Sequence, residues 1–213
     1  MRPLSPQDIL SVWERGAHQG APERALALLA RACPEVGLAE LAALPLDERD
    51  HLLLELRVLT FGARLESVAR CPHCGEWLEL ELPAAELLAT PTSLELGAEL
   101  ELELEGQPLR VRVPTSEDLL ALRKSTGRRD TALLDRCVSG DAALRRAAFD
   151  RLVDARPNLE VMIELACVEC GQPWQERFDP GEYLWTEVRA QARRLLLDIH
   201  ALASTYGWPE HDV

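Results

Sequence analysis

The chain contains no long apolar run, and none approaches the roughly 20 residues that a membrane-spanning helix requires. Its first six residues, MRPLSP, lack the apolar core of a signal peptide. These two absences predict a soluble protein of a reducing cytoplasm. In that compartment, closely spaced cysteines are more often metal ligands than disulfides.

The sequence also lacks the short motifs of common enzyme classes: it has no HExxH, no GxSxG, no phosphate-binding glycine loop and no dinucleotide fingerprint. It has five histidines, and none of them is spaced with a nucleophile in a recognisable way. We interpret His73 as a solvent-facing turn residue and His200 as a polar residue on a helix surface. We therefore expect no enzymatic activity and no small-molecule substrate.

Positive charge is scarce, because 23 lysines and arginines face 36 aspartates and glutamates, which gives a formal net charge of -13. Such a surface repels nucleic acid and anionic membranes at long range, so neither is an expected partner. Basic residues do gather in one part of the chain, but acidic residues are interleaved with them and predict a balanced surface rather than a phosphate-binding patch. The basic residues are Arg123, Lys124, Arg128, Arg129, Arg145 and Arg146.

Against these absences stand two copies of one cysteine motif, CPHCG at 71–75 and CVECG at 167–171. Two cysteines separated by two residues can hold one ion from a tight turn, and the glycine that follows permits the left-handed backbone that such a turn often needs. Together the motifs supply four thiolates, the full ligand set of a closed tetrahedral zinc site. The sequence therefore predicts one structural Zn²⁺ held by Cys71, Cys74, Cys167 and Cys170.

Two other uses of these cysteines are less consistent with the pattern. A thioredoxin-like redox pair begins a helix, whereas residues 77–82 alternate with period two and predict a strand. A catalytic zinc needs an open coordination position, which four sulfurs do not leave. Reversible oxidation of the same thiols, with loss of the metal, remains an alternative. The other two cysteines, Cys33 and Cys137, lie on apolar helical stretches and are expected to be buried free thiols.

The segments around the motifs predict an α+β protein. Residues 1–62 form an N-terminal helical unit, with helices at 8–14, 22–32 and 48–61; Leu52, Leu53, Leu56 and Leu59 make the core stripe of the third helix. Residues 63–82 and 159–179 are the two halves of a split zinc ribbon, each a hairpin with a cysteine motif at its tip. Residues 83–158 form an inserted module of a hairpin and helices, and residues 180–213 contain a long C-terminal helix.

The inserted hairpin has a predicted register. A four-residue turn at 105–108 would pair Leu104 with Leu109 and Leu102 with Val111, which leaves Glu103 opposite Arg110 on the other face. A capping box at 115–118, formed by Thr115 and Asp118, is expected to open the helix that follows. In the C-terminal helix, an apolar stripe recurs at steps of three, four and seven: Leu184, Val188, Leu195, Ile199, Leu202 and Tyr206.

The order of these motifs resembles the phage T4-type baseplate proteins of contractile-tailed phages and related phage-like contractile injection systems. The resemblance extends over nearly the whole chain, and the series around the cysteines makes it more specific than the cysteines alone. It is carried by LAALP (41–45), ERD (48–50), LLL (52–54), LTFG (59–62), LE (65–66), CPHCGE (71–76), LE (78–79), VPT (113–115), DL (118–119), RC (136–137), CVECG (167–171), LW (184–185) with Glu187, HALA (200–203) and YGW (206–208).

The resemblance implies a non-enzymatic role in baseplate construction, either as a component or as an assembly factor for the central hub. Its implied partners are baseplate hub or tail proteins, and its implied location is the bacterial cytoplasm during assembly or the phage-like particle itself. The metal ligands of the family correspond to the four cysteines named above. Similar proteins continue past the YGW stretch into another helix with basic residues, whereas this chain ends at Val213.

A nucleic-acid-binding zinc ribbon is the alternative function. It requires a basic face near the cysteine motifs, where Arg70 and Arg177 lie. The acidic residues of the same strands and turns outnumber these arginines, so this alternative is less consistent with the sequence. The acidic residues are Glu76, Glu79, Glu81, Glu169 and Glu176.

Overall fold

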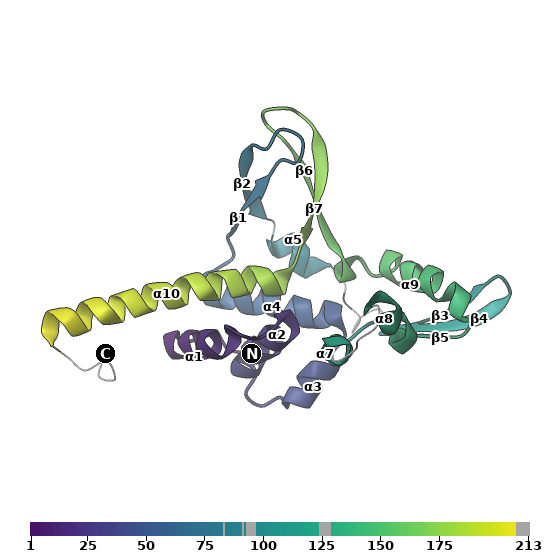
Figure 1. The fold of residues 1–213 in the computed structure, drawn as a ribbon, viewed down its shortest axis with the longest axis horizontal. Helices are drawn as coiled ribbons and strands as arrows, with labels where there is room; N and C mark the ends of the chain where they lie inside the picture. The colour runs from purple at the N-terminus through teal and green to yellow at the C-terminus, as the bar shows by residue number, and fades with distance from the viewer. Residues whose placement is uncertain (83, 91, 93–96, 124–128, 208–213) are drawn as a thin grey trace.

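The computed structural model describes residues 1–82, 84–90, 92, 97–123 and 129–207. A helical body lies at the centre, two β-hairpins rise from one face of it, a small three-stranded sheet with helices lies at one side, and the C-terminal helix extends beyond it at the other (Figure 1). This arrangement confirms the α+β class and the long C-terminal helix. No helix in the described ranges is both long and apolar enough to cross a membrane.

Four helices form the N-terminal part of the body: α1 (Pro6–Gly16), α2 (Ala21–Ala32), α3 (Leu38–Ala43) and α4 (Leu46–Phe61). Ser5 and Asp8 cap α1 with a reciprocal capping box, in which each side chain accepts a hydrogen bond from the other residue's backbone N–H. Helix α3 was not predicted. The start of α4 also differs from the expectation, because the helix begins directly after Pro45, before Asp47.

The predicted core stripe of α4 is partly wrong. Leu53 and Leu56 are fully buried in the core that α4 shares with α2 and α10, but Leu59 is 52% exposed. In its place Leu54 is buried in a second apolar cluster, at the base of the hairpins. Helix α4 therefore buries two faces, one against the helical bundle and one under the hairpins, and Leu59 lies on neither.

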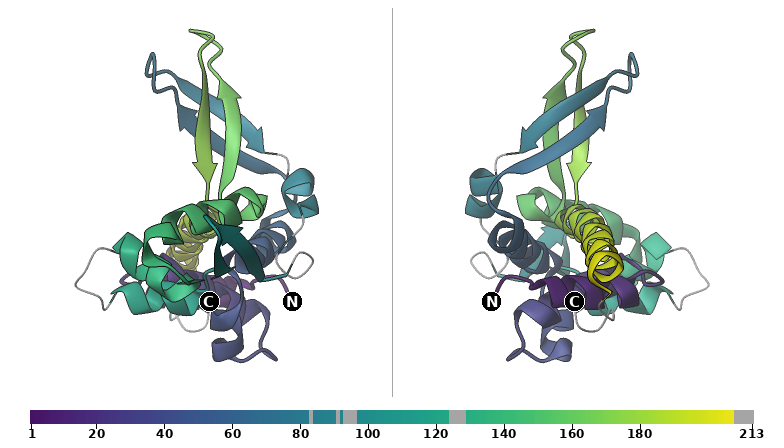
Figure 2. Two further views of the ribbon diagram at one scale, coloured as in Figure 1. Left: turned by 90° about the vertical axis from the view of Figure 1, so that its right-hand side faces the viewer. Right: turned by 90° about the vertical axis from the view of Figure 1, so that its left-hand side faces the viewer.

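The two hairpins rise from the same face of the body (Figure 2). One pairs β1 (Leu65–Arg70) with β2 (Trp77–Leu82), and the other pairs β6 (Val161–Ala166) with β7 (Pro173–Phe178). Alternating side chains of β1 and β2 are buried and exposed, as the sequence pattern indicates. Leu65, Leu82 and Phe178 close the base of the hairpins over α4 and over α5 (Ala84–Ala89).

The inserted segment contains β3 (Glu99–Leu104), β4 (Gln107–Arg112), α7 (Ser116–Arg123), α8 (Arg129–Cys137), β5 (Val138–Ser139) and α9 (Arg145–Asp154), with short 3₁₀ turns at Ala142–Leu144 and Pro157–Leu159. The short strand β5 pairs with β4 and was not predicted. Helix α7 packs on the N-terminal bundle, and the N–H of Leu46 donates to the carbonyl of Pro114 at 2.9 Å.

The register of the inserted hairpin differs by two residues from the prediction. Leu104 pairs with Gln107, Leu102 with Leu109 and Glu101 with Arg110. The turn has two residues, Glu105 and Gly106, with φ angles of 51° and 74°. Two successive positive φ angles are typical of the tight hairpin turn whose twist matches the strands. Because the shift is an even number, the apolar face of the hairpin is unchanged.

Asp118 is the polar centre of the inserted segment. Its side chain is 1% exposed, and it accepts hydrogen bonds from two guanidinium groups: Arg112 at 2.6 and 2.8 Å and Arg136 at 2.8 Å. It also accepts from the backbone N–H of Thr115 at 3.0 Å, as the capping box predicts. One carboxylate thus joins β4, α7 and α8.

Three of the basic residues that the sequence analysis grouped together form ion pairs, Arg123 with Glu23, Arg145 with Asp135 and Arg146 with Asp150. Each of these three arginines is therefore balanced by a carboxylate. Lys124 and Arg128 lie outside the described residues.

Helix α10 (Pro180–Tyr206) begins at Asp179, whose side chain accepts from the N–H of Glu182 at 3.0 Å, and ends at Gly207 in the left-handed conformation. Its first half packs on α1, α2 and α4. Arg57 of α4, only 3% exposed, donates two hydrogen bonds to the Glu187 carboxylate at 2.7 and 2.6 Å. The YGW stretch of the sequence is described only up to Gly207.

Candidate metal centre

Each cysteine motif forms the same turn at the tip of its hairpin. In the first, the N–H of Cys71 donates to the carbonyl of Glu76 at 2.8 Å and the N–H of Gly75 donates to the carbonyl of Cys71 at 2.9 Å. In the second, the equivalent bonds join Cys167 to Gln172 and Gly171 to Cys167, at 3.1 and 2.9 Å. The glycines have φ angles of 79° and 70°, which confirms the left-handed position expected from the sequence.

The two tips meet, so that cysteines 93 or more residues apart in the chain face one another. The Sγ atoms of Cys74 and Cys167 are 3.5 Å apart, and those of Cys71 and Cys170 are 3.8 Å apart. All four sulfurs lie within 4.8 Å of one another. Sulfurs bound tetrahedrally to zinc at about 2.3 Å would be separated by about 3.8 Å. The cluster therefore has the dimensions of a four-sulfur metal site.

The sulfurs lie at a boundary between core and solvent. Cys71 and Cys167, the first cysteine of each motif, are buried with Leu78, and Leu80 and Trp174 pack against them. Cys74 and Cys170 are exposed. The inner half of the site is thus held by apolar contacts between the hairpins and the outer half is open to solvent, so a metal ion could enter without opening the core.

The thiols differ in their tendency to ionise. Burial opposes ionisation of Cys71, but hydrogen bonds from the N–H groups of Cys74 and His73 and from neighbouring thiols outweigh it and lower the pKa of Cys71 to about 6. The N–H of Glu76 favours the Cys74 thiolate, yet the adjacent sulfurs and burial raise the pKa of Cys74 to about 12. Metal binding to such a cluster must release protons, because all four ligands are thiolates in the bound state.

His73 lies where the sequence predicts, and Arg70 contacts the first cysteine turn. His73 is exposed in the turn, and the only metal-competent cluster within the described ranges consists of the four cysteines. Arg70 donates from Nε to the carbonyl of Gly75 at 3.0 Å and lies over the Trp77 ring. Arg70 therefore braces the first cysteine turn.

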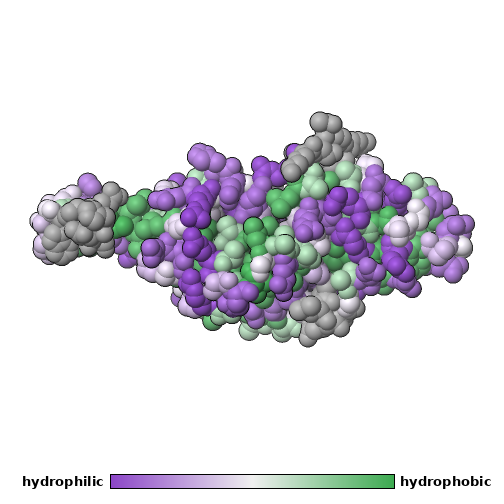
Figure 3. Space-filling model, turned by 90° about the horizontal axis from the view of Figure 1, so that it is seen from below, coloured by the Kyte–Doolittle hydropathy of each residue, from purple (hydrophilic) through white to green (hydrophobic). Residues whose placement is uncertain are grey.

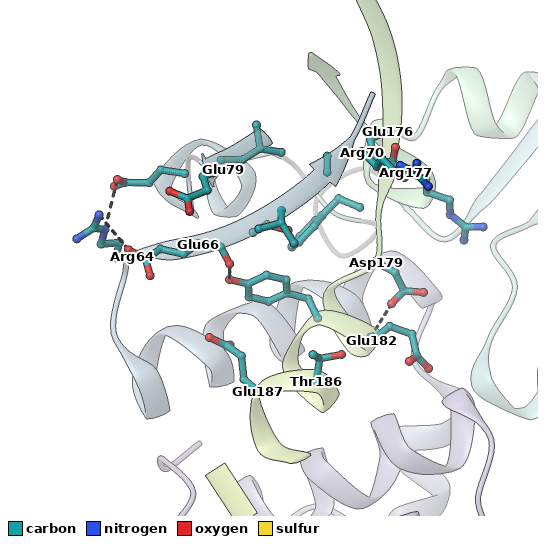
Figure 4. A pocket seen from close by; sticks show the side chains of 17 residues that line it. Arg64, Glu66, Arg70, Glu79, Glu176, Arg177, Asp179, Glu182, Thr186 and Glu187 are labelled. Atoms are coloured by element: carbon teal, nitrogen blue, oxygen red, sulfur yellow. Dashed lines mark hydrogen bonds and ion pairs between the residues drawn. The ribbon is translucent and has the colours of Figure 1, made fainter. Parts of the chain in front are cut away.

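Below the metal centre, a cleft of about 1040 Å³ lies between β1, β7 and the first turns of α10 (Figure 4). Tyr183 of α10 lines the cleft and donates its hydroxyl to the carbonyl of Glu66 at 2.6 Å, which fixes β1 to the helix. The Arg57 guanidinium lies 5.5 Å from the centre of the Tyr183 ring. Neither Tyr183 nor Arg57 was singled out in the sequence, because no local pattern indicates a partner 117 or 130 residues away.

A closed set of four sulfurs can bind a metal tightly but leaves no position for a substrate or an activated water. Tetrahedral sulfur sites of this kind hold zinc or iron. Comparisons of the chain with family models, with curated proteins and with solved structures find no match.

Proposed function

We propose that this protein is a non-enzymatic component of a phage tail or contractile injection system, acting in the baseplate or in assembly of its hub, and that one structural zinc ion holds its two hairpins together. The observation that carries the proposal is the meeting of the two cysteine turns, with Sγ distances of 3.5 and 3.8 Å across the hairpins. The baseplate role rests on the resemblance carried by the series of motifs around those turns.

The need for a metal follows from how little else joins the hairpin tips. A two-stranded hairpin alone is marginally stable in water, and the tips share an apolar contact of only a few side chains. A tetrahedral ion would replace that weak contact with four bonds. It would also close the chain between Cys74 and Cys167, which are 93 residues apart, and thereby join the two ends of the inserted segment.

Zinc is favoured over other ions by the ligand set. Four thiolates suit a soft or borderline ion, and zinc accepts a tetrahedron without a redox requirement. Oxygen-preferring ions such as Mg²⁺ and Ca²⁺ would find no carboxylate in the cluster.

A structural protein fits the rest of the surface better than a nucleic-acid-binding one. The net charge of -13 becomes about two units more negative with a four-thiolate zinc centre. Arg70, next to the metal centre, donates from Nε to the cysteine turn, and the acidic residues of the same strands and turns outnumber the two arginines there. Function is therefore assigned to contacts with other proteins.

The test is native mass spectrometry of the protein expressed together with the proteins encoded beside it, before and after chelation. We expect one zinc per chain in a complex with tail or hub proteins, and loss of that complex on chelation. The matched variants are Cys167→Ser, which removes a ligand, and His73→Ala, which alters an exposed residue of the same kind of turn and should change nothing. A solitary, metal-free chain would contradict both parts of the proposal, whereas a zinc-bound solitary chain would contradict only the baseplate role.

A further inference from the structure

A second groove, of about 800 Å³, lies between β2 of one hairpin and β6 of the other. Helix α5 and the 3₁₀ turn at Pro157–Leu159 contribute the rest of its lining. We call it the hairpin groove. It is separate from the cysteine turns, none of whose residues line it.

Apolar and acidic residues occupy different parts of the hairpin groove. Its floor consists of buried or half-buried apolar side chains, which are Leu80, Leu82, Leu87, Val161, Ile163 and Leu165. Its rim consists of exposed glutamates, which are Glu79, Glu81, Glu86, Glu160 and Glu164. No lysine, arginine or histidine is among the described residues that line it. On the opposite face of the molecule, seen from below, hydrophilic and hydrophobic residues are interleaved instead (Figure 3).

The negative charge of the rim has little compensation from this chain. Glu81 lies 3.4 Å from the Nε atom of Arg64, but the two side chains are 63% and 71% exposed. In the part of the chain that the structure describes, the carboxylates of the other four rim glutamates form no ion pair. By contrast, Arg123, Arg145 and Arg146 of the inserted segment each have an acidic partner. The rim is therefore complementary to a positively charged partner.

The β2 wall of the groove is an open strand edge. In an antiparallel pair, the backbone groups of alternate residues point toward the partner strand and those of the others point away from it. The bond from the Cys71 N–H to the Glu76 carbonyl sets this alternation, and the register then directs the backbone groups of Glu79 and Glu81 away from β1. Each hairpin is a two-stranded sheet, so within the described ranges no further strand covers this edge.

The free carbonyl of Glu66 agrees with this alternation. Glu66 pairs with Glu81, and its carbonyl accepts a hydrogen bond from Tyr183 of α10 on the other edge of the same hairpin. Both members of that pair therefore direct their backbone groups out of the hairpin, one toward α10 and the other toward the groove.

The side chains of β2 indicate what a strand added at this edge would contain. Leu78, Leu80 and Leu82 face the other hairpin, whereas Glu79 and Glu81 are exposed on the outer face. Residues side by side on one face of neighbouring strands contact each other. A strand beside β2 would therefore meet leucine on one face and glutamate on the other, so apolar and basic residues in alternation would fit it best.

We propose that the hairpin groove binds an extended segment of a partner protein in which apolar and basic residues alternate, and that this segment adds to the free edge of β2. Backbone hydrogen bonds to Glu79 and Glu81 hold the segment as a third strand. Its apolar side chains cover the floor and its basic side chains pair with the rim.

This inference rests on the proposed function in one respect, which is that the chain acts through contacts with other proteins. It adds the chemistry of the segment that such a partner presents. The two walls of the groove belong to the two hairpins whose tips the metal joins, so zinc content is measured together with binding in the test below.

The test is fluorescence anisotropy of a labelled synthetic peptide, KVKVKVK, titrated with the zinc-loaded full chain. The control peptide, KKKKVVV, has the same composition and charge but cannot place its lysines and valines on opposite faces of a strand. We expect saturable binding of the alternating peptide that weakens as salt is added. The control peptide should bind about tenfold more weakly.

Two matched variants test the place of binding. Glu79→Lys and Glu103→Lys each reverse the charge of an exposed strand glutamate, and only Glu79 lies in the groove. Both change the net charge equally, so any non-specific attraction falls equally. Glu79→Lys should weaken binding about tenfold, and Glu103→Lys should leave it within about twofold of the wild type. Glu164→Lys, on the β6 wall, should also weaken it.

Hydrogen exchange tests the strand addition itself. The peptide should slow the exchange of amide hydrogens in β2 and leave those of β1 unchanged. Equal affinity for the two peptides would overturn the proposal, as would an equal loss of binding in Glu79→Lys and Glu103→Lys. Binding without slower exchange in β2 would assign the groove to a helical or irregular basic segment instead.

Circular dichroism and zinc content should be the same in all the variants, because the substituted glutamates are exposed. A zinc-loaded wild-type chain that does not bind the alternating peptide would contradict this inference alone. A chain that binds the peptide but contains no zinc would support the groove and contradict only the metal site.

Discussion

Replacing Asp118 by alanine should destabilise the inserted segment more than any other single carboxylate change in it. The side chain is 1% exposed and receives three hydrogen bonds from Arg112 and Arg136. Removing one member of a buried ion pair costs roughly 3–5 kcal/mol, and loss of a helix cap adds about 1 kcal/mol. The two arginines are 33% and 44% exposed, so water can solvate them again and the cost is reduced.

We therefore expect Asp118→Ala to lower the free energy of unfolding by about 3 kcal/mol, which in a chain of this size corresponds to a fall in Tm of about 6–12 °C. The assay is thermal and urea unfolding followed by circular dichroism. Asp141→Ala is the matched control, since Asp141 is exposed and its side chain accepts from the N–H of Ala143 at 2.8 Å as a helix cap. It should cost about 1 kcal/mol or less. Equal effects of the two substitutions would refute the reasoning.

The pH dependence gives an independent check. Burial opposes ionisation of Asp118, but the hydrogen bonds from Arg112, the Thr115 N–H and Arg136 outweigh it and hold the pKa of Asp118 well below its usual range. A carboxylate with a lowered folded pKa stabilises the protein above its unfolded pKa of about 4, and this contribution is lost as the pH falls toward the folded value. The stability difference between wild type and Asp118→Ala should therefore be constant from neutral pH to about 5 and shrink below about 4.

Two further substitutions test the packing of α10. A glycine-to-alanine change within a helix normally stabilises it, but a Cβ at Gly16 would lie 2.4 Å from the buried Trp185 ring. We therefore expect Gly16→Ala to lower the free energy of unfolding, measured by thermal unfolding, by about 1–3 kcal/mol. The control Gly37→Ala should lack this cost, because nothing lies within 4 Å of a Cβ at that position. Glu187→Gln leaves the buried Arg57 guanidinium with a neutral partner, and we expect it to lower the free energy of unfolding by about 2 kcal/mol. The control Glu182→Gln should cause no measurable change, because the Glu182 side chain is 47% exposed.

The features that follow from short-range patterns were predictable from the sequence. The cysteine turns, their glycines and the alternating strands beside them need only neighbouring residues to be recognised, and the structure has all of them. That Cys74 and Cys167 meet was inferred from chemistry, because each motif alone supplies only two ligands.

The wrong predictions share one cause: more than one local conformation was consistent with the sequence, and tertiary contacts determined which of them formed. The hairpin at 99–112 could satisfy its apolar face with either a two-residue or a four-residue turn, and only the twist of the strands favours the tight turn at Glu105 and Gly106. Leu54 and Leu59 look alike in the sequence of α4. Leu54 is buried because the hairpin base happens to cover it, and no local pattern records that contact.

The hydrogen bonds that join distant segments could not be predicted from the sequence either. Arg57 with Glu187 and Tyr183 with Glu66 fix α10 to α4 and β1 across more than a hundred residues. Asp118 was predicted only as a member of a capping box, because Arg112 and Arg136 reach it through the folding of three separate elements.

The measurement that tests the central claim most directly is the metal content and thermal stability of the purified chain, for the wild type and for Cys74→Ser, Cys167→Ser and His73→Ala. The account predicts one zinc per chain in the wild type and in His73→Ala, with a lower Tm after chelation. It predicts little or no zinc, and a Tm near that of the chelated protein, in both cysteine variants. A wild-type protein that contains no zinc, and whose Tm is the same with and without chelator, would contradict it.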